Sequence, residues 1–486
     1  GFYDDFGAMK WSAGDWVWHG YTMLCLDTPE DARAFPGGEV ALPVRVAHAG
    51  SGPCTGTLRL RLEGAPGITL EPAVGDPLGV RVERAEAIDA ASGEAALAVE
   101  PGSVSEAVVL RVAVRDAAGT PAGARGRGPG RPVRVRLHAE LHGSHPARNT
   151  WDLWVLPEAA PADASGVRIV DALDPDTLAF LRGGGRVLLR AGDRPHSLKT
   201  QAIWFLRGAC FAPPHPLHAR VPAALLEELQ TFDLETGRVL LWDRLQGQID
   251  PILAFWETHD IAEVRAHLFA GDCRVGEGRL LVSVLDHEFP AGRWLLGEFV
   301  RHLTAGPAPA RALREATVAA LAALLASETI PLPEWELRTD PKDEGLRAGF
   351  AEGKAPADGW LKVHTRGHWE GQGVGHYDGV AWYRTWVDVP ASWQDKAVRA
   401  VFEGVDDSFR LYVNGTEVAR FGDPEKDETV WLQRVSADVS AALRPGERNA
   451  IVLRVVDHRG AGGVWKPVFL TTAPADASSD LLHAPR

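Results

Sequence analysis

The residues best suited to acid–base chemistry form two titratable groups in the middle of the chain. They follow the strand-like segments 251–255 and 278–285, and comprise Glu257 and His259, then Asp286, His287 and Glu288. Carboxylates and imidazoles are the usual general acids and bases, and α/β domains place their sites beyond strand ends. Glu257 and His287 are therefore the candidate site residues of this region. The alternative is that these polar side chains cap loops and form interdomain hydrogen bonds.

Neither a nucleophilic cysteine nor a metal site is predicted. The cysteines are widely separated, without CxxC or Cys/His metal spacing: Cys25, Cys54, Cys210 and Cys273. Pro213 and Pro214 disfavour a helix running on from Cys210, and Cys273 leads into a hairpin-like turn, so both are expected to be buried and inert. His215 and His218 lack a third ligand at a sensible spacing.

A second set of chemistry-bearing residues lies between Gly367 and Leu470. Sugar binding uses flat aromatic rings against C–H faces and planar polar groups for hydroxyls. The candidate carbohydrate-binding residues are Trp369, Asp407, Arg459, Trp465 and Lys466. Glycine-rich loops are expected to expose Trp369 and Trp465. The alternatives are that Trp382 and Trp386, which lie in an alternating strand, belong to the core, and that Asp406 and Asp407 cap backbone N–H groups at a strand bend.

Residues 29–158 read as a β-sandwich of immunoglobulin type. Polar and apolar residues alternate with period two in segments such as 40–46, 57–62 and 133–137, and Gly/Pro turns separate them. Residues 1–28 form an aromatic-rich lead-in with Trp11, Trp16, Trp18 and Tyr21.

Residues 166–306 change character. Helices are expected over Asp174–Leu181 and Ala291–Leu303, between near-continuous apolar strands at 186–190 and 278–285. This alternation predicts an α/β layer with a parallel sheet.

The last third is predicted to be a β jelly roll. Residues 307–353 contain an Ala/Leu helix from Ala308 to Ser327 and a polar linker from Pro331 to Glu352. Strands follow over 354–475, one of them closed by a type I′ hairpin turn at Asn414-Gly415. Residues 476–486 are a polar tail expected to be frayed.

Particular motifs in two of these regions carry a family resemblance. Segments 377–384, 404–416 and 462–467 together resemble the galactose-binding-type jelly roll of family-2 glycoside hydrolases, the β-galactosidase and β-glucuronidase group. Residues 166–306 resemble the flavodoxin/amidotransferase-like α/β domain embedded in some family-2-like glycosidases, on His215-Pro216, Phe232-Asp233-Leu234 and the segment 275–282. The fold class implied is multidomain β and α/β.

The resemblance implies a part of such an enzyme without its catalytic centre. In this family the acid/base is a Glu directly after an Asn, but Asn149, Asn414 and Asn449 are followed by Thr, Gly and Ala. The expected role is therefore a non-catalytic accessory portion that supports carbohydrate binding, substrate-rim shaping and assembly. Two alternatives are a free-standing carbohydrate-binding or assembly protein, and hydrolysis by the α/β domain at Glu257 and His287.

The implied partners are carbohydrate and a catalytic glycosidase barrel, in the same parent or in another chain; a homo-oligomer stays open. No cofactor is predicted except a structural calcium ion, common in this fold, for which Asp406/Asp407 and Asp423/Asp427 offer oxygen ligands.

The net charge of −14 over 486 residues disfavours nucleic acid and anionic membrane surfaces as partners. The residues contain no signal-peptide pattern and no transmembrane run. Because the chain lacks an initiator Met, we expect that it begins at an internal boundary, and the compartment is left open.

Overall fold

The computed structural model describes residues 20–27, 38–73, 76–84, 88–116, 130–157, 165–203, 210–242, 245–260, 263–353, 358–426, 428–475 and 481–483. The chain forms two compact units, each built from separate stretches of sequence. One comprises 1–170, 181–190 and 201–312, and the other comprises 171–180, 191–200 and 313–486. Trp11, Trp16 and Trp18 of the expected lead-in lie outside the described residues, whereas Tyr21 is 77% exposed.

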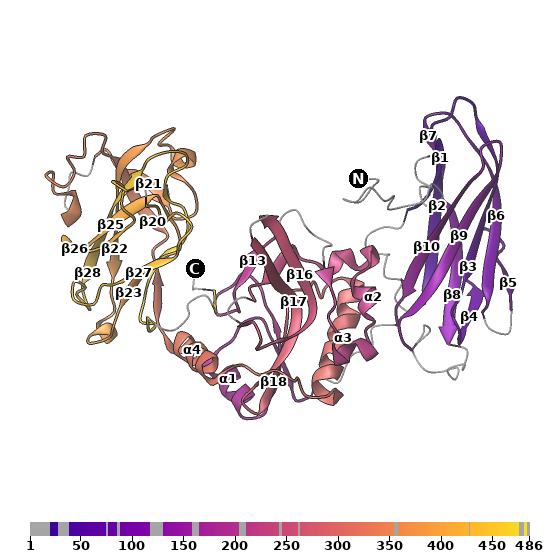
Figure 1. Ribbon diagram of the computed structural model, residues 1–486, viewed down its shortest axis with the longest axis horizontal. Coiled ribbons are helices and arrows are strands. Elements are labelled where there is room, and N and C mark those ends of the chain that lie inside the picture. The colour runs from indigo at the N-terminus through magenta and orange to yellow at the C-terminus, as the bar shows by residue number, and fades with distance from the viewer. Residues whose placement is uncertain are drawn as a thin grey trace. The chain divides into compact units, whose positions relative to one another are not determined.

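The first sandwich consists of two antiparallel sheets that face each other (Figure 1). One sheet has the order β1-β2-β8-β4, with β7 paired to β2: β1 (Thr22–Leu26), β2 (Glu39–His48), β4 (Ile68–Pro72), β7 (Ser103–Val104) and β8 (Val108–Asp116). The other has the order β10-β9-β3-β6-β5: β3 (Cys54–Glu63), β5 (Arg81–Glu83), β6 (Ala90–Val99), β9 (Val133–Gly143) and β10 (Ala147–Val155). Inward residues such as Leu42, Leu60 and Leu137 are wholly buried. The period-two pattern therefore places one apolar face of each sheet in a shared core.

The middle region is a mixed sheet, not the parallel sheet that the sequence predicted. Its order is β11-β12-β18-β17-β15-β13, with β16 joining β17 to β14. The strands are β11 (Val167–Val170), β12 (Arg186–Arg190), β13 (Thr200–Ala202), β14 (Cys210–Phe211), β15 (Arg238–Leu240), β16 (Asp250–Asp260), β17 (Glu263–Val275) and β18 (Gly278–Ser283). The strands β11, β12 and β18 run parallel to one another, whereas the pairs β14–β16, β15–β17, β16–β17 and β17–β18 are antiparallel. A tight turn between Val275 and Gly278 makes β17 and β18 a hairpin, which forces antiparallel pairing.

Helices accompany this region near the predicted positions: α1 (Pro175–Arg182), α2 (Ala223–Leu226) and α3 (Pro290–Ala305), with 3₁₀ turns η4 (Pro216–Ala219) and η5 (Leu229–Leu234). Gly184 follows α1 with a φ of 97°, as expected for a turn after a helix end. The helix α3 packs on β11, β12 and β18.

The second sandwich has a four-stranded sheet, β19-β30-β23-β27, and a six-stranded sheet, β21-β20-β22-β28-β25-β26, with a small β24-β29 pair. The strands are β19 (Thr329–Pro331), β20 (Glu334–Thr339), β21 (Leu361–His364), β22 (Gly379–Asp388), β23 (Arg399–Phe402), β24 (Val405–Asp406), β25 (Ser408–Val413), β26 (Thr416–Phe421), β27 (Val435–Asp438), β28 (Arg448–Asp457), β29 (Gly463–Val464) and β30 (Val468–Thr471). Three short 3₁₀ turns accompany them: η7 (Phe350–Glu352), η8 (Trp369–Gln372) and η9 (Ala391–Trp393). Asn414 and Gly415 have φ values of 50° and 87° in the turn between β25 and β26, which confirms the predicted hairpin.

Two boundaries differ from the sequence-based expectation. The Ala/Leu helix α4 (Glu315–Ala326) begins seven residues later than Ala308, after the prolines at 307 and 309. The linker expected from Pro331 to Glu352 contains β20, which pairs with both β21 and β22. That expectation was wrong because Trp335 and Leu337 point into the core and are almost wholly buried, while charged residues alternate with them.

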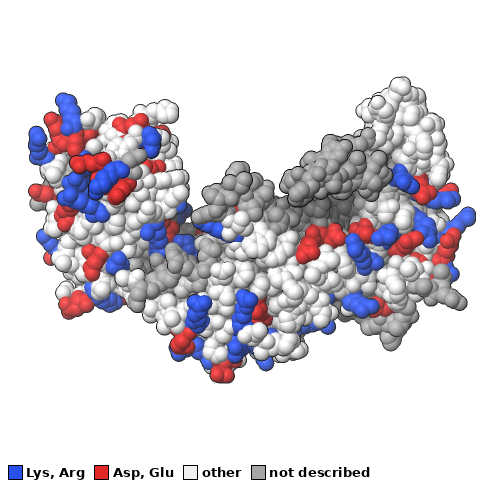
Figure 2. Space-filling view, in the orientation of Figure 1, with Lys and Arg blue, Asp and Glu red and all other residues white. Residues whose placement is uncertain are grey.

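None of the helices formed by the described residues is both long and apolar enough to cross a bilayer. On the face drawn in Figure 2, basic and acidic side chains are interspersed.

Candidate functional site

A cavity of about 610 Å³ lies beside Trp465 and Lys466 in the second sandwich. These residues follow β29, where Gly463 adopts a φ of 99° and turns the chain toward β30. Residues 191–200 of the same compact unit form the opposite wall, because Leu198 pairs with Leu482. The other polar lining residues are Asp193, Lys199, Thr200, Thr365, Arg366, Glu403, Arg434 and His483.

The indole ring of Trp465 is held in place from several directions. The imidazole of His368 stacks on it, with ring centroids 5.2 Å apart and planes 15° from parallel. The indole N–H donates to the carbonyl oxygen of Trp431 at 3.2 Å. The Lys466 ammonium lies 4.1 Å from the ring centroid. Trp465 thus acts as a rigid wall and as a platform for a cation.

The cavity carries an excess of positive charge. Lys199 donates to Glu403 at 3.3 Å, and Arg434 lies 3.9 Å from the same carboxylate oxygen. Arg366 and Lys466 are two further basic lining residues, and Asp193 is a second acidic one, so four basic side chains face two carboxylates. Burial lowers the pKa of Lys466, with Glu403 acting in the opposite direction and Lys199 adding to the lowering. Such a partly desolvated ammonium gains from an anionic partner.

The other three residues predicted to contact sugar are placed elsewhere. Trp369 is wholly buried and stacks on Tyr383, so the expectation that its loop exposes it was wrong. Asp407 is 8% exposed and accepts the backbone N–H of His458 at 3.2 Å, which matches the capping alternative. Arg459 is exposed on the loop after β28, and its backbone N–H donates to Asp457.

Three carboxylates meet under this loop: Asp406, Asp407 and Asp457, with oxygens within 4.8 Å of one another. Burial, with Asp407 close by, raises the pKa of Asp406 well above its usual range. Burial also raises the pKa of Asp457 to about 6. Each side chain is less than a tenth exposed, so a glycosidic bond cannot reach between them, although their spacing resembles that of a glycosidase pair.

The cluster has the character of a cation site. Asp457 is 1% exposed, and its Oδ2 is buried with no hydrogen-bond partner among the described residues. A buried, unpartnered carboxylate oxygen is costly. Hard divalent cations such as Ca²⁺ take oxygen ligands of this kind. Of the second predicted calcium pair, Asp423 is bonded to Lys426, and Asp427 lies outside the described residues.

Glu257 and His287 have separate partners. Glu257 Oε2 lies 2.6 Å from His267 Nε2 and accepts from Gln201 at 3.1 Å. His287 Nδ1 lies 3.2 Å from the carbonyl oxygen of Gly292, and its Nε2 lies 3.0 Å from the Ser283 hydroxyl. The side chain of His259 is not among those described. The contacts of His287 match the alternative of a polar side chain that holds a loop, whereas Glu257 is bonded to residues of two other strands.

Of the two cysteines expected to be buried and inert, Cys273 is buried, whereas Cys210 is only partly buried. Burial raises the pKa of Cys210 to about 12 and that of Cys273 further, so neither is a thiolate near neutral pH.

His215 has partners that the sequence did not reveal. Its Nε2 lies 3.1 Å from Asp272 Oδ1, and His302 Nε2 lies 2.9 Å from Asp272 Oδ2. Asp272 is wholly buried in β17, and His302 comes from α3. His215 Nδ1 accepts the N–H of Leu217, so its Nε2 is the donor to Asp272. This network holds a strand, a helix and a turn together.

Comparison with solved structures finds limited similarity to β-glucuronidase from Ruminococcus gnavus. The structure in complex with D-glucuronic acid is 20% identical, with a TM-score of 0.27 over 31% of this chain and 30% of that chain. The structure in complex with uronic isofagomine is 19% identical, with a TM-score of 0.28 over 31% and 28%. The chain spans less than a third of the length of these proteins, and the TM-scores are too low to bear on function. No protein-family profile matches the chain, and no curated protein sequence matches it.

Proposed function

We propose that this chain is a non-catalytic accessory portion of a family-2-like glycoside hydrolase, and that it binds carbohydrate in the cavity beside Trp465. In this proposal the first sandwich is immunoglobulin-like, the mixed sheet is amidotransferase-like, and the second sandwich is a galactose-binding-type jelly roll. The observation that carries it is the cavity itself: about 610 Å³, with a fixed indole wall and convergent polar groups. Small-molecule sites typically combine such a volume with a few placed polar groups.

The positive charge of the cavity favours an acidic saccharide as the ligand. The lining contains four basic side chains, Lys199, Arg366, Arg434 and Lys466, against two carboxylates, Asp193 and Glu403. A carboxylate-bearing sugar offers charge-assisted hydrogen bonds to these cations, while its C–H face can contact the exposed edge of the indole.

Isothermal titration calorimetry tests the proposal. Oligosaccharides containing uronic acids are expected to bind with one site per chain, and neutral oligosaccharides of equal length at least about tenfold more weakly, a difference of about 1.4 kcal/mol. The same preparations should not turn over chromogenic glycosides, because the chain has no Asn–Glu pair. Turnover, or equal binding of neutral and acidic sugars, would contradict the proposal.

A second hollow of about 480 Å³ provides an internal comparison. It lies on the six-stranded sheet and is lined by residues that include Lys362, Arg384, Trp386 and Arg448. Arg384 is bonded to Glu336 at 2.8 Å and lies over the ring of Trp360. The cation of Arg384 is therefore paired, whereas Lys466 forms no salt bridge among the described residues, which favours the cavity at Trp465 as the sugar site.

We further propose that Asp406, Asp407 and Asp457 hold a divalent cation, calcium by preference. The cation would offset most of the negative charge of the three buried carboxylates and fix the loop after β28. Its role is structural, because the cluster is buried away from the surface.

The accessory role implies a catalytic barrel as partner, in the same polypeptide or in another chain, and a homo-oligomer remains an alternative assembly. The competing function is a free-standing carbohydrate-binding or assembly protein. Light scattering of the chain with a barrel that carries the Asn–Glu pair separates the two. A complex supports the accessory role, and sugar binding by a chain that never associates with a barrel supports the free-standing one.

A further inference from the structure

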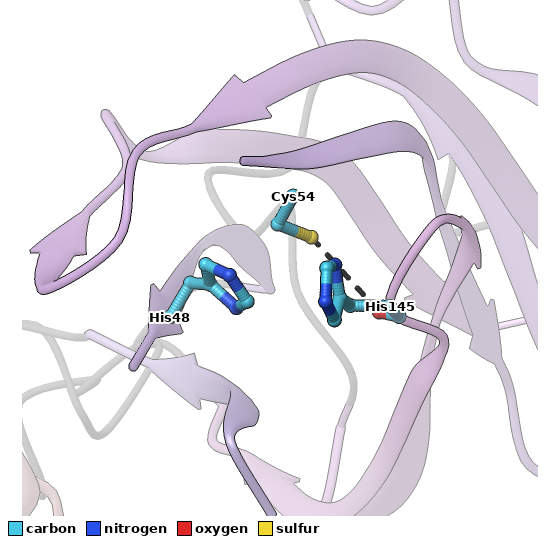
Figure 3. Close-up of side chains that lie close together, drawn as sticks. All are labelled: His48, Cys54 and His145. Carbon is cyan, nitrogen blue, oxygen red and sulfur yellow. Dashed lines mark hydrogen bonds between the residues drawn. The ribbon is translucent and has the colours of Figure 1, made fainter. Parts of the chain in front are cut away.

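One end of the first sandwich brings together a thiol and two imidazoles (Figure 3). His48 is the last residue of β2, Cys54 is the first residue of β3, and His145 lies in the turn between β9 and β10. One ligand atom from each lies within 4.8 Å of the others. The two rings are 4.5 Å apart between centroids, with planes 54° from parallel.

The hydrogen bonds around His48 fix its tautomer. Nε2 lies 2.7 Å from the carbonyl oxygen of Gly52, and a carbonyl can only accept, so Nε2 carries the hydrogen. The lone pair of the neutral ring is then on Nδ1, which lies 2.8 Å from the Thr22 hydroxyl. A ring N–H donated to a carbonyl is the usual way a protein orients a metal-ligating histidine.

His145 is oriented in a similar manner. Its Nδ1 lies 3.2 Å from the Ser144 hydroxyl, which also faces the carbonyl oxygens of Pro53 and Thr55 at 3.3 Å. When the single hydroxyl hydrogen is donated to one of those carbonyls, Nδ1 of His145 donates to the hydroxyl oxygen and Nε2 carries the lone pair. Among the described residues, no hydrogen bond to this Nε2 is formed.

Cys54 supplies the third group. Its side chain is wholly buried, and its sulfur lies 3.9 Å from the carbonyl oxygen of His145. Burial raises the pKa of this thiol, so the metal-free cluster holds a neutral thiol. No carboxylate belongs to the cluster, which disfavours hard cations and favours ions that take nitrogen and sulfur.

We propose that His48, Cys54 and His145 form a site for a borderline divalent transition-metal ion, with zinc as the expected occupant. One sulfur and two imidazole nitrogens fill three positions of a tetrahedral ion, and water takes the fourth. Binding breaks the S–H bond and the hydrogen bond from the Thr22 hydroxyl to His48 Nδ1, forms metal–sulfur and metal–nitrogen bonds, and releases the thiol proton to solvent. Ligand atoms around such an ion are about 3.5 Å apart, so these three groups, whose ligand atoms lie within 4.8 Å of one another, draw together on binding.

The competing explanation is that Cys54 is a core residue and that the imidazoles only brace the end of the sandwich. Cobalt(II) distinguishes the two, because thiolate ligation gives an intense sulfur-to-metal charge-transfer band in the near ultraviolet together with visible d–d bands. The His215–Asp272–His302 cluster contains no thiol, so cobalt bound there gives no charge-transfer band.

The experiment is titration of the reduced, chelator-treated full chain with Co²⁺, followed by displacement with Zn²⁺. The expected result is one cobalt per chain with both bands, and their loss when one equivalent of zinc is added. Cys25→Ser is the matched control, because Cys25 is exposed on β1 and outside the cluster; it should keep both bands.

Two variants locate the site. Cys54→Ser should remove the charge-transfer band, and His145→Ala should weaken zinc binding at least about tenfold, since even a residue that only hydrogen-bonds to a metal ligand contributes about 10- to 100-fold. His145 is half-buried in a turn, so its variant is expected to fold, and far-ultraviolet circular dichroism checks this. A charge-transfer band that persists in Cys54→Ser but vanishes in Cys25→Ser, or no band in the folded wild type, would overturn the proposal.

Discussion

The ammonium of Lys466 lies 4.1 Å from the centre of the Trp465 indole ring, at the edge of the cavity in the second sandwich. The indole is itself held by His368 and by the carbonyl oxygen of Trp431. A flexible lysine is thereby held at a defined place before any ligand arrives. Preorganisation of this kind reduces the ordering cost of binding.

The first prediction concerns Lys466. Lys466→Met keeps the contact with the indole ring but removes the charge, so binding of an acidic oligosaccharide should weaken by roughly 10- to 100-fold, as expected for loss of a charge-assisted hydrogen bond. Titration calorimetry measures the change. Lys362→Met, in the hollow on the six-stranded sheet, is the matched control and should bind as the wild type does. Equal losses in both variants would contradict the assignment to this cavity.

The second prediction concerns the pH dependence of stability. Burial raises the pKa of Asp457 to about 6, above about 3.9 in the unfolded chain. The folded protein then binds more protons than the unfolded one between these values, so its stability falls as pH rises through about 4 to 6. In chelator, the melting temperature of the second sandwich should therefore be lower at pH 7.5 than at pH 5. Asp457→Asn should reduce this difference and raise the melting temperature at pH 7.5.

The third prediction concerns the proposed cation. Ca²⁺ binds ionised carboxylates, so millimolar Ca²⁺ should raise the melting temperature at pH 7.5 and have little effect at pH 5. Differential scanning calorimetry with Ca²⁺ and with chelator measures both effects. Asp423→Asn is the control variant, because Asp423 is paired with Lys426 outside the cluster; it should respond as the wild type does. If Ca²⁺ still raised the melting temperature of Asp457→Asn, this cluster would be excluded as the calcium site.

The fourth prediction tests the hairpin that makes the sheet mixed. A Cβ at Gly278 would clash with the carbonyl oxygens of Leu181 and Gly185, both backbone atoms. Gly278→Ala should therefore lower the free energy of unfolding by about 1–3 kcal/mol, the usual cost of overpacking. Gly371→Ala is the control, because nothing lies within 4 Å of its added carbon; its effect should stay within about 0.5 kcal/mol. Chemical denaturation measures both.

Local patterns predicted much of the fold. Period-two alternation predicted the strands of the first sandwich. Asn414-Gly415 predicted a hairpin turn, and the structure confirms its positive φ values. The linker prediction failed at β20, where charged residues at alternate positions concealed Trp335 and Leu337. A strand of only six residues with one polar face is hard to recognise from its own sequence. Its pairing with β22 depends on the rest of the sheet.

The candidate site was only partly predictable. Trp465 was predicted to be exposed because glycines precede it, and Lys466 was proposed as a polar group for sugar hydroxyls. The same glycine argument predicted that Trp369 is exposed, but Trp369 is buried in the core. Lys199 and Glu403 are far apart in sequence and meet only because residues 191–200 belong to the same compact unit as the second sandwich. His302 and Asp272 have no motif that links them to His215. Long-range contacts of this kind depend on tertiary packing, which single-sequence patterns do not encode.

Hydrogen–deuterium exchange with and without a saturating acidic oligosaccharide tests whether the sugar binds in the cavity at Trp465, because it locates the bound sugar on the chain. If the sugar binds in the cavity at Trp465, protection of backbone amides is confined to the segments around 198–200, 403–404, 432–434 and 465–467. The ligand is not hydrolysed during the experiment. Protection at Arg384 and Trp386 instead, or cleavage of the oligosaccharide by the purified chain, would contradict this prediction.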